Sequence, residues 1–249
     1  MKTLALFNLK GGVGKTVSAV NLAALASASG LKTLLWDLDP QGSAAWYLGV
    51  DTDEIGGMKR LARGKTTIGE LIRQTGVSRL DLVAGGLSSL HLEAAQADHA
   101  SLLARLTEPL SEEYHLLIYD CPAGLQAINE AVLGQADAVA MPMIPTSLSV
   151  HTYEVFLRYL SKRRLSGLKL YPFLTQVDRR RRLHRDLVEA LPAQIQTLLE
   201  ATVPYASVVE QMGPRRLPLP LFAPKTTAGQ AYAALWSELA DALSHRRPG

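Results

Sequence analysis

Short apolar runs recur along the chain and predict the strands of a buried sheet. They are bounded by Gly, Pro or charged residues and lie at residues 3–7, 32–36, 80–84, 114–120, 136–141 and 168–175. Continuous apolar runs of this length are typical of strands that are covered on both faces. The chain therefore has the pattern of an internal sheet.

Between these runs, apolar residues recur at three- and four-residue steps, a spacing that predicts helices. The helices are expected at residues 17–29, 90–106, 149–161, 184–199 (interrupted near Pro192) and 229–243. The alternation predicts an α/β fold, a mostly parallel twisted sheet with helices on both faces. We expect a single domain over residues 1–249.

Residues 43–74 fit this alternation less clearly, because helical pieces are interrupted by the pair Gly56-Gly57. The segment also carries a group of basic residues, Lys59, Arg60, Arg63 and Lys65. We interpret this group as a solvated face rather than a site, because charge runs are usually exposed.

The stretch Asn8 to Thr16 joins the first strand to the first helix and is rich in glycine. Glycines let the backbone curl so that several N–H groups face an anion, and the following helix N-terminus adds partial positive charge. Lys15 is placed to reach the β- and γ-phosphates of a nucleotide, and the Thr16 hydroxyl is placed to bind Mg²⁺. The usual pattern G-x-x-x-x-G-K-[ST] is not met, because Leu9 stands at its first Gly.

Carboxylates follow two of the predicted strands. Asp37 and Asp39 end the strand at residues 32–36, and Asp120 ends the strand at residues 114–120. Ligands of open α/β sheets bind at the carboxyl ends of the strands, and a carboxylate there commonly holds Mg²⁺ through water. The alternative for Asp37 and Asp39 is a solvated turn, in which Asp is a favoured residue.

The sequence Lys-Gly-Gly-Val-Gly-Lys-Thr, with its second lysine Lys10, resembles the deviant P-loop of the ParA/MinD ATPases. The wider string at residues 8–23 and the Asp-x-Asp-Pro-Gln string at residues 37–41 are most similar to the ParA/Soj partition branch. The resemblance implies ATP and Mg²⁺ as cofactors and an ATP-dependent homodimer. It also implies that Lys10 contacts the nucleotide of the partner subunit and that Asp39 orients the attacking water.

The motifs predict three sets of site residues together with the resemblance, which also implies that Asp37 supports the Mg²⁺ shell. The expected catalytic residues are Lys10, Lys15 and Asp39. The expected metal ligands are Thr16, Asp37 and Asp120. The expected nucleotide contacts are Lys10, Gly11, Gly12, Val13, Gly14, Lys15, Thr16, Val17 and Pro204.

Positive charge is concentrated in one part of the chain. The net charge is only +3, but residues 158–185 contain ten Lys or Arg and a single acid, Asp178. A dense basic field suggests a polyanionic partner. By resemblance to an Asp-x-Arg string of the family, Arg180 is the leading candidate for contact with double-stranded DNA, and a solvated turn is the alternative. The other candidates are Arg179, Arg181, Arg182, Arg215 and Arg216.

Part of the family pattern is missing after Pro204. Relatives have an arginine and an asparagine there, where this chain has Tyr205 and Ala206. The usual contacts to adenine and a second DNA-binding arginine are therefore in doubt, and Arg215 and Arg216 are possible substitutes.

A single cysteine, Cys121, excludes an internal disulfide and suits a reducing cytosol. We expect it to be a small buried residue, since no histidine-containing motif accompanies it. No stretch reaches the ~18 apolar residues of a membrane span. The apolar stripe of residues 229–243 is expected to pack into the core, because the other face of that helix is acidic rather than basic. We therefore expect a cytoplasmic protein with no membrane partner.

The leading hypothesis is an ATPase switch. Its ATP-bound dimer would bind DNA non-specifically, associate with the nucleoid, and be released by hydrolysis that a ParB-like or cargo-adaptor protein stimulates. The second hypothesis is a regulator that acts by nucleotide-dependent protein contact without DNA. A third, an electron-transfer relative holding a metal cluster, is disfavoured by the single cysteine.

Overall fold

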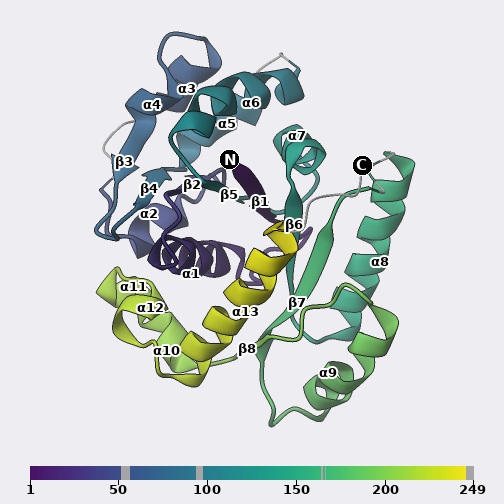
Figure 1. Cartoon of the computed structure of the whole chain (residues 1–249). Coiled ribbons are helices and arrows are strands. Elements are labelled where there is room, and N and C mark those ends of the chain that lie inside the picture. Colours follow the sequence, from purple (N-terminus) through teal and green to yellow (C-terminus); the bar gives the residue numbers. More distant parts are fainter. Residues whose placement is uncertain (52–56, 94–97, 164, 166, 245–249) are drawn as a thin grey trace.

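The computed structural model describes residues 1–51, 57–93, 98–163, 165 and 167–244. Its centre is an eight-stranded sheet in the order β3-β4-β2-β5-β1-β6-β7-β8 (Figure 1). All neighbouring strands pair in parallel except β3, which pairs antiparallel to β4 at the edge. The strands are β1 Lys2–Leu6, β2 Thr33–Asp37, β3 Ile72–Gln74, β4 Leu80–Val83, β5 Leu116–Asp120, β6 Ala138–Met143, β7 Leu170–Val177 and β8 Thr202–Pro204.

Helices cover both faces of the sheet (Figure 1). The α-helices are α1 Lys15–Ala28, α2 Ser43–Tyr47, α3 Gly57–Ala62, α4 Ile68–Leu71, α5 Leu90–Glu93, α6 His99–Thr107, α7 Ala127–Gln135, α8 Ser147–Lys162, α9 Arg182–Gln194, α10 Ser207–Glu210, α11 Met212–Arg215, α12 Leu219–Phe222 and α13 Thr227–Ser244, with 3₁₀ turns at Leu87–Ser89 and Glu108–Glu112. One core joins the sheet to α1, α2, α12 and α13, and the other joins it to α6, α7, α8 and α9. The α/β class with helices on both faces is therefore confirmed.

All six predicted strands are present, and so is the apolar stripe of α13. Tyr232, Leu235 and Leu239 of that helix are buried. Two strands, β3 and β8, were not predicted, and β3 lies in the segment expected to be helical. The strand β6 runs on through Pro142, which needs no N–H there because the pairing of β6 with β1 ends at Ala140.

Two helix predictions need correction. The helix expected at residues 90–106 is not continuous, because a separate helix, α6, begins at His99. Asp98 caps its N-terminus, and the Asp98 carboxylate accepts a hydrogen bond from Ala100 N at 3.1 Å. Residues 94–97 of that prediction lie outside the described residues. The helix expected at residues 184–199 begins at Arg182 and ends at Gln194, five residues earlier than predicted. The predicted interruption near Pro192 is wrong, because α9 continues through Pro192. The helix α7 was not predicted.

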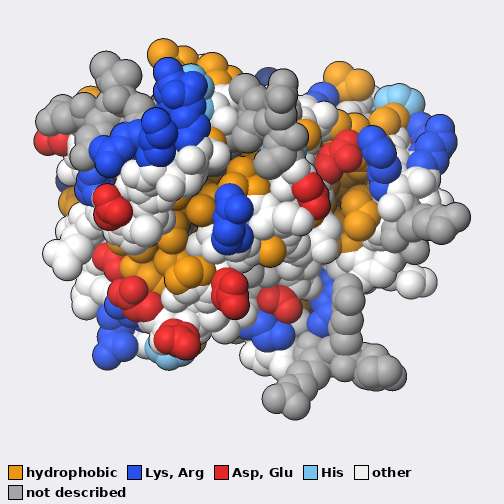
Figure 2. Space-filling model, turned by 90° about the horizontal axis from the view of Figure 1, so that it is seen from above, with side chains coloured by type: hydrophobic (Ala, Val, Ile, Leu, Met, Phe, Trp, Pro, Cys, Tyr) orange, Lys and Arg blue, Asp and Glu red, His pale blue; other side chains and the backbone are white. Residues whose placement is uncertain are grey.

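The basic group near α3 is exposed, as expected of a solvated face. Lys59, Arg60, Arg63 and Lys65 are all exposed. Figure 2 looks down on the side that carries α3 to α6 and shows Lys and Arg side chains projecting from it around hydrophobic surface.

One glycine fixes the approach of two loops at the carboxyl end of the sheet. A Cβ on Gly85 would lie 2.6 Å from the Asp39 carbonyl oxygen and 2.7 Å from the Asp37 carboxyl carbon. Real Cβ atoms do not approach so closely, so the loop after β4 contacts the loop after β2 only because residue 85 has no side chain. Gly86 strengthens the contact by donating its N–H to the Asp39 carbonyl at 3.1 Å.

Gly85→Ala is expected to lower the free energy of unfolding by about 1–3 kcal/mol, the usual cost of forcing a methyl group into a packed site. Gly134→Ala is the matched control, because Gly134 lies exposed in α7 with nothing within 4 Å of an added Cβ. That variant should gain up to about 1 kcal/mol, because Ala is the better helix former. Urea denaturation measures both, and equal stability of the two variants would contradict the steric account.

Candidate functional site

The glycine-rich loop lies between β1 and α1 and is tied to the neighbouring strand. The Asn8 side-chain amide donates to the Pro142 carbonyl at 2.7 Å, and its oxygen accepts from Lys10 N at 2.9 Å. Gly12 and Gly14 have φ of 73° and 85°, values that residues with a side chain rarely adopt. The sequence therefore sets a curled loop directly before the first turn of α1.

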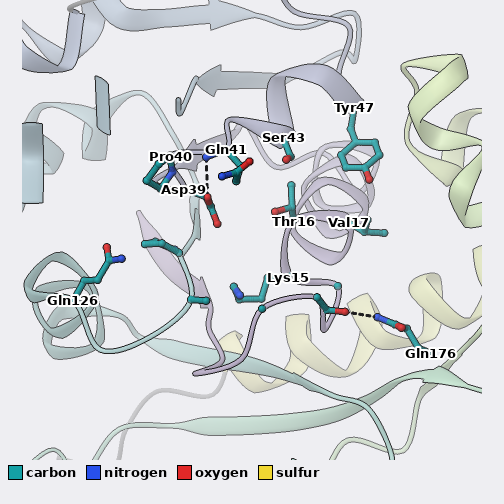
Figure 3. Close-up of a pocket in the computed structure, with 15 residues that line it drawn as sticks. Lys15, Thr16, Val17, Asp39, Pro40, Gln41, Ser43, Tyr47, Gln126 and Gln176 are labelled. Atoms are coloured by element: carbon teal, nitrogen blue, oxygen red, sulfur yellow. Dashed lines mark hydrogen bonds between the residues drawn. The ribbon is translucent and has the colours of Figure 1, made fainter. Parts of the chain in front are cut away.

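A cavity of about 630 Å³ opens over this loop (Figure 3). The ends of four strands contribute to it: β1, β5 and β2, which are adjacent in the sheet, and β7, which supplies Gln176. Its walls comprise Gly11, Gly12, Gly14, Lys15, Thr16, Val17, Asp39, Pro40, Gln41, Ser43, Tyr47, Pro122, Ala123, Gln126 and Gln176. Six of the expected P-loop residues and Asp39 are thus brought together, whereas Val13 is buried and does not line the cavity. Sequence reasoning missed Ser43, Tyr47, Gln126 and Gln176.

Lys15 is held inside the cavity wall, with only 7% of its surface exposed. Its ammonium donates to the Lys10 carbonyl at 3.1 Å. Burial lowers the pKa of Lys15, and the nearby charges of Asp120, Asp39 and Cys121 oppose that shift. A phosphate in the cavity would supply the missing counter-charge, which fits the role expected of this lysine.

Asp120 is fully buried at the end of β5, beside Leu6 of β1 and Asp37 of β2. Neither of its carboxylate oxygens has a hydrogen-bond partner at good geometry within the described part of the chain. Burial raises the pKa of Asp120 and the charge of Asp37 adds to the rise, while the Thr16 hydroxyl and Lys15 oppose it. A cation next to these oxygens would remove the cost of burying them.

This arrangement fits Mg²⁺ held by Thr16 and Asp120. Magnesium usually takes one or two protein oxygens and completes its shell with water and substrate phosphates. Within the described ranges, no cluster of three or more His, Cys, Asp or Glu forms a cage for a metal. The two protein oxygens beside a phosphate loop are the donor set that magnesium requires.

Asp37 makes different contacts from those of a metal ligand. Its carboxylate accepts from Asp39 N at 2.9 Å and from Ala44 N at 3.1 Å. It therefore fixes the loop that carries Asp39 and accepts a hydrogen bond from a backbone N–H that has no partner within the first turn of α2. Burial raises its pKa to about 7. Its expected part in the magnesium shell stays a prediction.

Asp39 projects into the cavity toward Thr16 and Lys15 (Figure 3). One of its oxygens accepts from Gln41 N at 2.9 Å, which sets the orientation of the carboxylate. A carboxylate held in this way beside a phosphate site can orient a water molecule, which is the role that the sequence predicts.

A smaller cavity of about 210 Å³ adjoins the first and shares four residues with it, Gly14, Val17, Tyr47 and Gln176. Its walls include Pro204, which the sequence predicted, and Tyr205, which is 57% exposed. A nucleotide whose phosphates lie over the glycine-rich loop would place its base here. Tyr205 and Ala206, which stand where the family pattern has an arginine and an asparagine after Pro204, both line this base slot, and Glu210 lines it as well.

Lys10 does not line the larger cavity, although its backbone does contact Lys15. Its ammonium forms no hydrogen bond or ion pair with any residue that the structure describes. The side chain is thus available to a second molecule, as the predicted role across a dimer requires.

The arginines at residues 179–182 follow β7 at the same edge of the sheet as the site, and all four are exposed. We call them the arginine loop. Arg180 donates two hydrogen bonds to the Asp178 carboxylate, at 2.9 and 3.0 Å, and this pairing holds the pKa of Asp178 at about 2. Arg179 has no side-chain partner among the described residues. The structure therefore leaves Arg179 freer than Arg180, the candidate favoured by sequence.

Arg215 and Arg216 are not part of the arginine loop. The Arg216 guanidinium lies 5.0 Å from the Trp46 ring centre and 2.9 Å from the Asp51 carboxylate. The Arg215 guanidinium lies 5.0 Å from the Phe222 ring centre. Each is thus occupied by neighbours around α2 and α12. Cys121 is buried and unpaired, as expected.

The sequence matches a family model and several partitioning proteins. The model of a family described as an AAA domain, AAA_31, matches residues 1–168. The chromosome partitioning protein ParA of Myxococcus xanthus is 29% identical, over 96% of this chain and 87% of its own. The chromosome-partitioning ATPase Soj of Treponema pallidum is 28% identical, over 96% of each chain.

Solved structures share the fold. The septum site-determining protein MinD of Pyrococcus horikoshii, solved with Mg-ADP, superposes with a TM-score of 0.76 at 22% identity. The superposition covers 96% of this chain and 95% of that one. The similarity extends over the parallel sheet and both helical layers.

Asp120→Asn is expected to stabilise the ion-free protein, because it removes a buried charge. The raised pKa of Asp120 means that the folded protein keeps a proton that the unfolded chain releases, so wild-type stability falls as pH rises through that range. The gain in free energy of unfolding from Asp120→Asn should therefore be larger at about pH 8 than at about pH 5, because a larger fraction of the wild-type protein carries a protonated Asp120 at the lower pH. Urea denaturation in EDTA measures it.

The same variant should lose most of the stabilisation that Mg²⁺ with ADP gives to the wild type. Equal stabilisation of both proteins by Mg²⁺ with ADP would show that Asp120 is not at the metal.

Proposed function

This chain belongs to the AAA_31 family of AAA domains, as a ParA/Soj-type ATPase with a deviant P-loop, and we propose that it is an ATP-dependent dimerising switch that binds DNA non-specifically. Its hydrolysis of ATP would position DNA or a protein cargo. The observation that carries the proposal is the position of Lys15, Thr16 and Asp39 around one cavity, at the sheet edge that also carries the arginine loop. Asp120 is buried directly behind this cavity, close to Thr16 and Lys15.

The chain's cofactors are ATP and Mg²⁺. Thr16 and Asp120 would hold Mg²⁺, which supplies positive charge next to the β- and γ-phosphates. Lys15 binds the phosphates from inside the wall, and the N–H groups of the glycine-rich loop surround them. Asp39 holds the attacking water in line and accepts its proton. Asp37 keeps Asp39 in place through their shared hydrogen bond.

A second copy of the chain would cover the glycine-rich loop. In the sheet order β5-β1-β6 this loop is flanked by the loop after β5 and the start of α8, which expose Leu125 at 42% and Leu148 at 58%. Exposed apolar residues on both sides of a phosphate site suit an interface that closes over the nucleotide. Lys10 would cross this interface to the partner's nucleotide.

The energies are sufficient for such a switch. Shifting a two-state equilibrium from 1:99 to 99:1 needs about 5.5 kcal/mol of differential binding. Charge-assisted hydrogen bonds contribute roughly 1.5–3 kcal/mol each. Lys10 makes its contact only in the dimer, so its two copies contribute roughly 3–6 kcal/mol, which reaches the required amount at the upper end of that range.

Dimerisation would double the number of arginine loops that face one DNA molecule. Arginine contacts to phosphates release counterions, so the affinity would be non-specific and would fall steeply with salt. We propose that the ATP-bound dimer associates with the nucleoid in the cytoplasm. A ParB-like or cargo-adaptor protein would stimulate hydrolysis and release the dimer.

Among the helices that the structure describes, none has the length and apolar character of a membrane span.

A second candidate function is a regulator that acts by nucleotide-dependent protein contact without DNA. The contacts of Arg180 with Asp178 and of Arg216 with Asp51 favour it, because these guanidinium groups are already paired.

We also propose that residues 1–249 act as one ATPase domain, which the shared core of α1 and α13 supports.

Binding to random-sequence duplex DNA tests the proposal and separates the two candidates. We expect binding with ATP but not with ADP, with an affinity that falls as salt rises. Arg179→Ala should lower the affinity and the salt slope, because one phosphate contact per subunit is lost. Arg163→Ala is the control, since Arg163 precedes β7, at its other end, and pairs with Glu130 at 3.1 Å. No binding at low salt would favour the protein-contact regulator.

Lys10→Ala is expected to abolish the ATP-dependent dimer while leaving much of the nucleotide affinity, because Lys10 lies outside the cavity of its own subunit. Light scattering with ATP and with ADP measures the dimer fraction. Lys59→Ala, which removes an exposed lysine of α3, is the control. If the dimer fraction of Lys10→Ala equals that of the wild type, Lys10 does not act across the interface.

Asp39→Ala should stop phosphate release and keep the protein in its ATP-bound dimer, because the attacking water loses its orienting carboxylate. A coupled assay for free phosphate measures turnover, and light scattering measures the dimer. Normal turnover would remove Asp39 from the mechanism.

A further inference from the structure

The segment at residues 175–180 contacts three parts of the molecule in succession. The Gln176 side-chain amide donates to the Gly12 carbonyl of the glycine-rich loop at 2.8 Å (Figure 3). The carbonyl of Val177 accepts from Tyr205 N at 3.0 Å, which fixes the wall of the base slot. Asp178 then holds Arg180 through both carboxylate oxygens. One continuous piece of backbone thus joins the phosphate loop, the base slot and the arginine loop.

Gln176 has an unusual backbone conformation, with φ at 53°. Residues other than Gly, Asn and Asp seldom adopt this left-handed region, and such outliers gather at functional sites where the surroundings impose them. The side chain also lines both the larger cavity and the base slot. The conformation of its backbone and the hydrogen bond of its side-chain amide both serve to hold Gln176 in the wall of the nucleotide site.

We propose that Gln176 is a positioning residue that couples occupancy of the glycine-rich loop to the order of the arginine loop. A trans peptide points its C=O and its N–H in opposite directions. Because the Gly12 carbonyl faces Gln176, the N–H of the same peptide, carried by Val13, faces away from Gln176. A phosphate that accepts from Val13 N polarises this peptide and strengthens its hydrogen bond with Gln176.

The strengthened bond holds the end of β7 against the glycine-rich loop. Two residues later, the same backbone carries the contacts that shape the arginine loop. Asp178 N donates to His184 Nδ1 at 3.1 Å, and Arg180 N and Arg181 N donate to Asp178 at 3.1 and 3.0 Å. A bound nucleotide therefore reduces the opening of these hydrogen bonds within a single subunit. This coupling adds to dimerisation as a source of ATP-dependent DNA binding, and only that consequence rests on the proposed function.

Hydrogen–deuterium exchange of residues 178–184 tests the coupling without DNA. The probe is a non-hydrolysable ATP analogue with Mg²⁺, added at saturating concentration to Lys10→Ala at a protein concentration at which light scattering finds only a monomer, so that a dimer does not contribute. In that background we expect exchange to slow by about two- to tenfold, the range that one hydrogen bond of ordinary strength supports. Adding Gln176→Met, which keeps the length of the side chain but cannot donate, should abolish this slowing. The analogue should still bind, as calorimetry can check.

Two further variants make the result specific. Gln126→Met is the matched control, because Gln126 lines the same cavity from the opposite side (Figure 3) and forms no hydrogen bond that links it to the arginine loop through the residues described by the structure. It should keep the slowing. Gln176→Gly relieves the strained backbone and should lose the slowing as Gln176→Met does. Slowing that persists in both Gln176 variants would overturn the proposal.

The DNA measurement is kept separate from this test. If nucleotide slows exchange in a Gln176-dependent way but the wild type does not bind DNA, the coupling stands and the DNA-binding function fails. If the wild type binds DNA with ATP and exchange does not depend on Gln176, dimerisation alone carries the switch and the proposal is wrong.

Discussion

The constraint on which the rest of the site depends is a carboxylate buried between two strands, whose oxygens have no hydrogen-bond partner at good geometry among the described residues. Asp120 ends β5 directly beside Asp37 of β2, so two acids share a region from which water is excluded. The backbone satisfies Asp37, whereas Asp120 is left to a ligand. Burying the Asp120 charge costs free energy, and the nearby Lys15 ammonium and Thr16 hydroxyl offset part of that cost. Such an arrangement is stable when a cation and phosphates complete it.

The sheet order explains how one site can control distant surfaces. At the carboxyl edge the strands lie in the order β2, β5, β1, β6, β7 and β8, so Asp39 after β2, the glycine-rich loop after β1 and the arginine loop after β7 follow one another along this edge, with the ends of β5 and β6 between them. Close contacts join these parts: the absence of a side chain at Gly85 lets the loop after β4 approach Asp39, and the Gln176 side chain holds the end of β7 against Gly12. A change at the phosphates therefore reaches the edge of the molecule through short, packed connections rather than through a separate domain.

Much of the fold could be predicted from the sequence because the central strands are continuous apolar runs and the glycine-rich loop has a specific spacing. The edge strands β3 and β8 could not, since three residues carry too little pattern. The residues around Lys15 followed from the loop, but Gln176 and Gln126 lie far away in sequence and meet the cavity only through the fold. The pairing of Arg180 with Asp178 could have been anticipated, because the two are separated by one residue in a turn.

The most direct test of this account is calorimetric titration of a non-hydrolysable ATP analogue into the wild-type protein, with Mg²⁺ and with EDTA. We expect one site per chain and an affinity that falls by at least about tenfold, or 1.4 kcal/mol, when Mg²⁺ is removed. The buried Asp120 carboxylate would then face the phosphates without a cation between them. Equal affinity in both conditions would contradict the central role given to Asp120, and the absence of binding in both would contradict the nucleotide site itself.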